Sequence, residues 1–174
     1  MAGNPLATLP NLVSLSRIPM AAAFPFVGEV EGRLALVAAA AGTDFLDGYL
    51  ARSRHETSRL GALIDPIADR CFVLIAVATL FFESTLSLTA TVVLASRDLA
   101  VIPGFLSTRF VPQLKRFAFP ARPAGKVVTT LQLATLAIAY LAPALIATCI
   151  ALVAVASAVA IADYAAIVWK KRAS

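Results

Sequence analysis

Residues 44–69 read Asp44-Phe-Leu-Asp47-Gly48-Tyr-Leu-Ala-Arg52-Ser-Arg-His-Glu-Thr-Ser58-Arg-Leu-Gly61-Ala-Leu-Ile-Asp65-Pro-Ile-Ala-Asp69, and this stretch decides the fold. A short basic loop joins two apolar segments, and each segment carries a pair of aspartates. The pairs are spaced i,i+3 and i,i+4, so each pair lies on one face of a helix. We therefore expect two antiparallel neighbouring helices whose four carboxylates converge near the loop.

The rest of the chain is unusually apolar. Hydrophobic residues make up 60% of its 174 residues and charged residues only 14%, with a mean hydropathy of +0.85, whereas a soluble domain has about 45–50% apolar residues. The composition predicts an all-α, polytopic membrane bundle that forms a single domain over 1–174. Residues 1–10 are expected to form an interfacial segment. Six apolar stretches are long enough to cross a bilayer: 11–29, 32–53, 60–82, 86–108, 125–145 and 147–169.

Positive charge is distributed unevenly along the chain, whose formal net charge is +5. Basic residues gather in the connections 52–59 and 109–126 and in the tail after Trp169, while the other connections lack such clusters. Cytoplasmic loops of membrane proteins carry this excess of Lys and Arg. Six spans with both termini and the acidic pairs on the cytoplasmic side are therefore expected. The basic residues lie in loops between apolar spans, so nucleic acid is not an expected partner.

Ionisable residues inside membrane spans are functional candidates by default. Four converging carboxylates repel one another unless some are protonated or cations neutralise them. Two divalent cations balance Asp44, Asp47, Asp65 and Asp69, and hard oxygen ligands suit Mg²⁺ or Mn²⁺. Two alternatives remain open at this point. The first is an ion path in a cation transporter, and the second is a set of structural salt bridges with the arginines Arg52, Arg59 and Arg70.

Small and basic residues accompany the acids at fixed offsets. Gly48 lies one turn beyond Asp44 and leaves room on that face for a ligand or a close helix. Arg52 ends the first helix, where its guanidinium can bind a phosphate through two hydrogen bonds. Gly61 opens the second helix and lets a ligand approach the backbone. Packing between membrane helices is the alternative explanation for the glycines.

Together these residues form the pattern D-x2-D-G-x2-A-R-x8-G-x3-D-x3-D, which resembles the signature of the CDP-alcohol phosphotransferase family. The resemblance implies transfer of a substituted phosphate from a CDP-linked donor, in bacteria usually CDP-diacylglycerol, to an alcohol with release of CMP. It implies that the four aspartates bind two metals and that Asp69 is the general base. It also implies a homodimer in a bacterial cell membrane. Residues lining the nucleotide site would be Asn11, Gly48, Arg52, Ser58 and Gly61.

Further stretches bear on the acceptor alcohol. Asn11 and Arg17 resemble the family's N-terminal segment, which approaches the donor. Arg97-Asp98 and the stretch from Gly125-Lys126 to Gln132 resemble phosphatidylglycerophosphate synthases and cardiolipin synthases. Arg97, Arg109 and Lys126 are the candidates for a cationic pocket that binds the acceptor's phosphate.

Several acceptors stay open. Glycerol 3-phosphate is favoured over phosphatidylglycerol, although the Arg97-Asp98 pair resembles the cardiolipin type. Inositol phosphate, serine and choline are further alternatives. The alternative to an acceptor site is an intrahelical polar pair for Arg97 and Asp98, and contact with anionic lipid headgroups for Arg109. A pseudoenzyme with a structural role is disfavoured by the complete signature.

Overall fold

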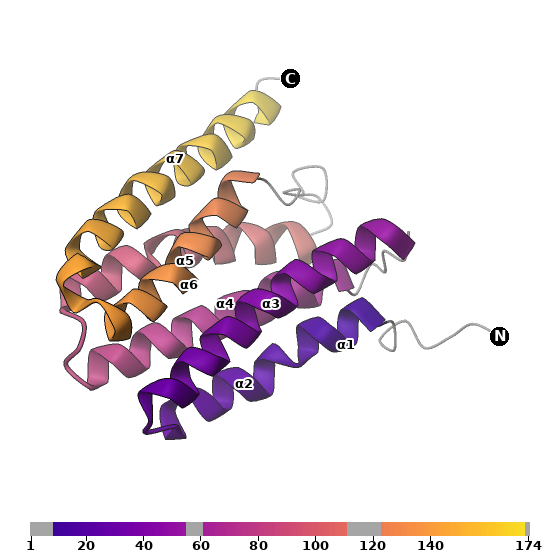
Figure 1. The fold of residues 1–174 in the computed structure, drawn as a ribbon. Coiled ribbons are helices and arrows are strands. Elements are labelled where there is room, and N and C mark those ends of the chain that lie inside the picture. Colours follow the sequence, from indigo (N-terminus) through magenta and orange to yellow (C-terminus); the bar gives the residue numbers. More distant parts are fainter. Residues whose placement is uncertain (1–8, 55–60, 111–122, 173–174) are drawn as a thin grey trace. The chain divides into compact units, whose positions relative to one another are not determined.

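The computed structural model describes residues 9–54, 61–110 and 123–172, with side chains described for 12–46, 67–100, 125–163 and 166. Regular secondary structure in these ranges is exclusively helical (Figure 1). The longer helices are α3 (Val30–Arg54), α4 (Gly61–Phe82), α5 (Leu88–Phe110), α6 (Pro123–Leu141) and α7 (Ile146–Arg172), preceded by α1 (Leu9–Leu15) and α2 (Arg17–Ala23). Residues 9–54, 61–110 and 123–172 also include two short 3₁₀ helices, η1 (Phe24–Phe26) and η3 (Pro143–Leu145).

The all-α prediction is confirmed, and the helices follow the predicted spans except at the N-terminus. The expected span over 11–29 is divided into α1, α2 and η1. The interruption falls at Ser16, whose hydroxyl donates to the Val13 carbonyl at 2.6 Å. Pro19 lies in the first turn of α2, where a residue without an N–H is tolerated. A hydropathy pattern does not detect this break, because all three segments are apolar.

The described chain divides into two compact units, residues 1–85 and 86–174. In the first unit α1 lies against α3 and α4, and α2 packs on α4. Phe24 and Phe72 are both buried and meet edge to face, with ring centroids 5.8 Å apart. Buried alanines Ala21, Ala40 and Ala68 lie on three different helices. Small residues let helix backbones approach closely, which is how helices associate where lipid removes the hydrophobic driving force.

A polar cluster, Arg33 with Glu83, links the start of α3 to the end of α4. Arg33 is buried, and its Nη2 donates to Glu83 Oε1 at 2.5 Å while its Nη1 pairs with Glu83 Oε2. Its Nε donates to the Val27 carbonyl at 2.5 Å, and its guanidinium lies 5.6 Å from the centre of the Phe24 ring. One side chain therefore connects the loop after η1, helix α3 and the segment after α4.

The end of α4 has the geometry of a Schellman motif. The Thr85 N–H donates to the Leu80 carbonyl and the Ser84 N–H to the Phe81 carbonyl, each at 2.9 Å. Ser84 has a φ of 60°, the left-handed conformation that this motif requires and that glycine adopts without strain. This turn places Glu83 beside Arg33.

In the second unit α7 packs against both α5 and α6. Val153, Ser157 and Ala160 form its buried stripe, whereas Val155 and Val159 are exposed. Pro143–Asp163, 21 residues with a mean hydropathy of 2.6, is the one helix within the described ranges that is long and apolar enough to cross a membrane. Shorter apolar helices cover Leu12–Phe26 and Gly125–Leu141.

Candidate active site

Asp44 continues the inward stripe of α3. Arg33, Val37 and Ala40 are buried at spacings of four and three residues, and Asp44 follows four residues later with intermediate exposure. Side chains at these spacings share one helix face. The helix face that packs into the first unit therefore carries the first carboxylate of the signature.

Asp69 occupies the corresponding position on α4. Ala68, Phe72 and Ala76 are buried on this helix. Asp69 directly follows Ala68 and lies one turn before Phe72, with a side chain that is 22% exposed. A carboxylate in such a partly buried position must be neutralised by a partner, since an unpaired charge in an apolar surrounding is costly.

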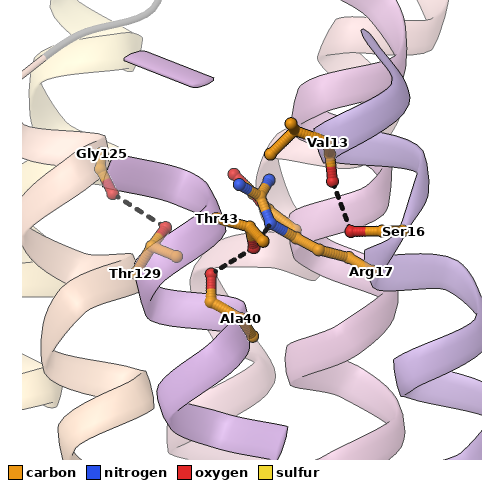
Figure 2. A network of polar contacts seen from close by, with 8 residues as sticks. Val13, Ser16, Arg17, Ala40, Thr43, Gly125 and Thr129 are labelled. Carbon is orange, nitrogen blue, oxygen red and sulfur yellow. Dashed lines mark hydrogen bonds and ion pairs between the residues drawn. The ribbon is translucent and has the colours of Figure 1, made fainter. Parts of the chain in front are cut away.

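Arg17 supplies that partner. Its side chain, 1% exposed on α2, pairs through Nη1 with Asp69 Oδ1. Its Nε donates to the Thr43 hydroxyl at 2.9 Å, and that hydroxyl donates onward to the Ala40 carbonyl at 2.9 Å (Figure 2). Thr43 directly precedes Asp44. One guanidinium thus links the helix bearing the first acidic pair to the last aspartate of the second pair.

Apart from the acceptor candidates Arg97 and Lys126, the other residues of the predicted site lie outside the described side chains or ranges. Within the described part of the chain no group of three or more His, Cys, Asp or Glu side chains is placed to hold a metal ion. The donor chemistry nevertheless fits a hard divalent cation, because Asp44 and Asp69 present carboxylates from inward faces of helices in the same unit. The predicted residues outside the description are Asn11, Asp47, Gly48, Arg52, Ser58, Gly61, Asp65 and Arg109.

Among the acceptor candidates, Arg97 is engaged within the second unit. It is 4% exposed, and its Nη1 donates to Asp98 Oδ1 at 2.7 Å. Gln132 Nε2 donates to Asp98 Oδ2 and to the Leu94 carbonyl, both at 2.7 Å, which joins α6 to α5. Arg97 and Asp98 thus form the intrahelical polar pair that the sequence analysis left open as an alternative. Arg97 Nε and Gln132 Oε1 are buried without a hydrogen-bond partner among the described residues, so the cluster retains unused polar groups.

Lys126 is exposed near the start of α6. The neighbouring threonine hydroxyls are used within the helix: Thr129 Oγ1 donates to the Gly125 carbonyl at 3.2 Å (Figure 2), and Thr130 Oγ1 to the Lys126 carbonyl at 3.0 Å. The roles of Arg97, Arg109 and Lys126 in acceptor binding stay predictions.

Comparison with known proteins identifies the family. The family model described as CDP-alcohol phosphatidyltransferase matches residues 7–167, nearly the whole chain. The chain belongs to this family. CDP-alcohol phosphatidyltransferases are polytopic membrane enzymes, in agreement with the all-helical architecture and with the apolar α7.

Relatives within the family carry two different names. A CDP-diacylglycerol–glycerol-3-phosphate 3-phosphatidyltransferase of Aquifex aeolicus is 33% identical over 113 residues, which cover 60% of this chain and 64% of the relative. A CMP-forming cardiolipin synthase of Streptomyces coelicolor is 36% identical over 116 residues, covering 60% of this chain and 54% of the relative. The human CMP-forming cardiolipin synthase is 34% identical over 107 residues, 59% of this chain and 36% of the relative. The matches thus span between about a third and two thirds of these relatives' lengths.

The contact of Arg17 with Asp69 was not foreseen from the sequence. Salt bridges to Arg52, Arg59 and Arg70 were the structural alternative considered there, whereas this partner of Asp69 lies on another helix, 52 positions earlier in the chain. Two features of the sequence could have drawn attention to this contact. Arg17 is the only charged residue in the first apolar stretch before Glu29, and Thr43 directly precedes the signature.

Proposed function

We propose that the chain transfers a phosphatidyl group from CDP-diacylglycerol to an alcohol and releases CMP. The observation that carries this proposal is the complete acidic signature from Asp44 to Asp69 in a chain whose family match spans residues 7–167. In the reaction the acceptor hydroxyl oxygen forms a bond to the phosphorus of the phosphatidyl group. The bond from that phosphorus to the CMP oxygen breaks, and the electron pair leaves with CMP.

Asp44, Asp47, Asp65 and Asp69 would hold two divalent cations, Mg²⁺ or Mn²⁺. When bound, the cations supply positive charge that stabilises the pyrophosphate and the CMP leaving group. Asp69 would take the proton of the attacking hydroxyl. The match of residue type supports these roles: carboxylates both ligate hard cations and accept protons, and Asp44 and Asp69 lie on inward helix faces.

On the donor side, Arg52 would bind phosphate oxygens through its guanidinium. Gly48 and Gly61 would allow close approach of the nucleotide, and Asn11 and Ser58 would complete its binding site. The donor's acyl chains would stay in the bilayer alongside the exposed apolar side chains of the bundle, of which Phe45 next to Asp44 is 71% exposed. A site that faces the cytoplasm in a bacterial cell membrane, and a homodimeric assembly, belong to the same proposal.

Glycerol 3-phosphate is the proposed acceptor. A phosphate-bearing acceptor suits the cationic residues Arg97, Arg109 and Lys126. Phosphatidylglycerol is the second candidate, because the Arg97–Asp98 pair resembles cardiolipin synthases and relatives of that name match over a similar share of the chain.

The test is CMP release by purified protein given CDP-diacylglycerol and Mg²⁺, with either glycerol 3-phosphate or phosphatidylglycerol and with thin-layer chromatography of the lipid product. Phosphatidylglycerophosphate formed only with glycerol 3-phosphate is the expected result. Cardiolipin formed only with phosphatidylglycerol would replace the proposed acceptor and keep the proposed chemistry. No CMP release with any phosphate-bearing or uncharged alcohol would overturn the proposed reaction.

A further inference from the structure

Arg17 is a buried cation that the signature does not include. It is 1% exposed on a helix whose other residues are apolar, so its charge is costly unless it is paired. The structure pairs it with Asp69, the residue proposed above as general base and metal ligand. If Asp69 ligates a cation, that cation already neutralises its carboxylate. The additional positive charge of the buried Arg17 guanidinium beside Asp69 therefore needs a separate explanation.

The guanidinium is also fixed in orientation. Thr43 uses its hydroxyl hydrogen on the Ala40 carbonyl at 2.9 Å, so an oxygen lone pair is left to accept from Arg17 Nε, also at 2.9 Å (Figure 2). An acceptor held in this way on α3 determines where the planar guanidinium lies. Arg17 therefore holds Asp69 in one orientation relative to the helix that carries Asp44.

We propose that Arg17, held by Thr43, is a positioning residue that fixes the Asp69 carboxylate for turnover at the cost of weaker cation binding. This inference rests on the proposed function and concerns how its acidic site is tuned. A permanent positive charge in contact with a metal ligand repels an incoming divalent cation. A carboxylate held in one orientation is also ready for the reaction, and small misplacements of such groups lower rates strongly.

The proposal predicts that loss of Arg17 strengthens Mn²⁺ binding but slows turnover, whereas misfolding would weaken both. Arg17→Gln removes the charge and retains polar atoms, so Mn²⁺ binding should tighten by about 3- to 10-fold. CMP turnover should fall by about 10- to 100-fold in the same variant, since Asp69 is no longer held. A residue needed only for folding would weaken both properties together.

Conservative variants separate the effect of the Arg17 charge from the effect of the Asp69 orientation. Arg17→Lys keeps the charge and loses the planar fork, so Mn²⁺ affinity should stay near that of the wild type while turnover falls. Thr43→Val removes the hydroxyl acceptor at nearly constant shape and should lower turnover by about 3- to 10-fold without tightening Mn²⁺ binding. Thr43→Ser keeps the hydroxyl and serves as the matched control, with both properties near those of the wild type.

The experiment is titration of purified full-length protein in detergent with Mn²⁺, followed through the electron paramagnetic resonance signal of free Mn²⁺, beside CMP release by the same samples. Gel filtration checks that each variant is folded. Tighter Mn²⁺ binding and slower turnover in Arg17→Gln support the inference; weaker or unchanged Mn²⁺ binding there, or wild-type turnover in Thr43→Val, overturns it. A wild-type protein that neither binds Mn²⁺ nor releases CMP would instead contradict the proposed function.

Discussion

Replacing Glu83 by glutamine tests the link between the start of α3 and the end of α4. The substitution keeps the length and shape of the side chain but removes its charge and places an amide N–H₂ opposite a guanidinium nitrogen. Arg33 would keep its bond to the Val27 carbonyl and its position over Phe24, yet lose a carboxylate that accepts from both of its terminal nitrogens.

The magnitude follows from how each partner is exposed. Breaking a fully buried ion pair costs about 3–5 kcal/mol, and an exposed pair is worth about 0–1 kcal/mol. The Arg33 side chain is 7% exposed and that of Glu83 is 39% exposed, so water screens one side of the pair. We expect Glu83→Gln to lower the free energy of unfolding by about 1–2 kcal/mol.

The assay is thermal unfolding of the detergent-solubilised protein, with Glu29→Gln as control because Glu29 is an exposed carboxylate on the neighbouring loop. The Tm of Glu83→Gln should fall by several degrees and that of Glu29→Gln should stay unchanged. A double-mutant cycle with Arg33→Met should reveal coupling between positions 33 and 83. Equal Tm values for the two glutamine variants, or additive effects in the cycle, would refute the reasoning.

The Arg33–Glu83 pair also makes the stability of the fold depend on pH. The hydrogen bond from Arg33 and its nearby charge hold the pKa of the Glu83 carboxyl below its ordinary value, although desolvation opposes them. Because the pKa is lower in the folded state, the pair stabilises the fold above the ordinary pKa of about 4.3 and loses that contribution as pH falls below it. The Tm difference between wild type and Glu83→Gln should therefore shrink on acidification below that pH. A difference that grows there would contradict this assignment.

Three further substitutions give defined outcomes. Ser84→Gly should raise the free energy of unfolding by about 0.5–1 kcal/mol, because glycine adopts the left-handed conformation without strain, and thermal unfolding with Ser84→Ala as control checks this. Gln132→Leu should lower the free energy of unfolding by about 1–2 kcal/mol, since Asp98 loses a buried donor. The exposed control Thr130→Ala should leave the free energy of unfolding unchanged. Asp69→Asn should lower CMP release by at least about 100-fold and keep the gel-filtration profile; wild-type-like release would remove Asp69 from the role of base.

Much of the helical frame was predictable because its signals are local. Apolar stretches of membrane length, separated by short polar or proline-containing connections, located α3 to α7 to within a few residues. Asp44 and Asp69 lie on the inward faces of their helices. That each shares this face with the other aspartate of its pair follows from helix geometry and stays a prediction. The division of the first span at Ser16 was missed, since one hydroxyl and one proline change hydrogen bonding without changing hydropathy.

The polar contacts between distant positions were not predictable. Arg17 with Asp69 and Arg33 with Glu83 are separated by 52 and 50 positions, and no periodicity connects such pairs. A signal for the second pair was present in the sequence but was not used: Arg33 is a lone basic residue on the side of the membrane expected to lack them, and Glu83 is an acid on the same side. Opposite charges at neighbouring ends of helices are a reasonable signal of a pair, although they do not give its geometry.

The central claim is that the acidic pairs serve a metal-dependent transferase and do not serve an ion path. The most direct measurement reconstitutes the purified protein in liposomes containing CDP-diacylglycerol, and follows CMP release and Mn²⁺ entry in the same sample after Mn²⁺ and glycerol 3-phosphate are added. We predict CMP release that stops on chelation of the metal, with no Mn²⁺ entry above protein-free liposomes. Mn²⁺ entry without CMP release would contradict the account and favour transport.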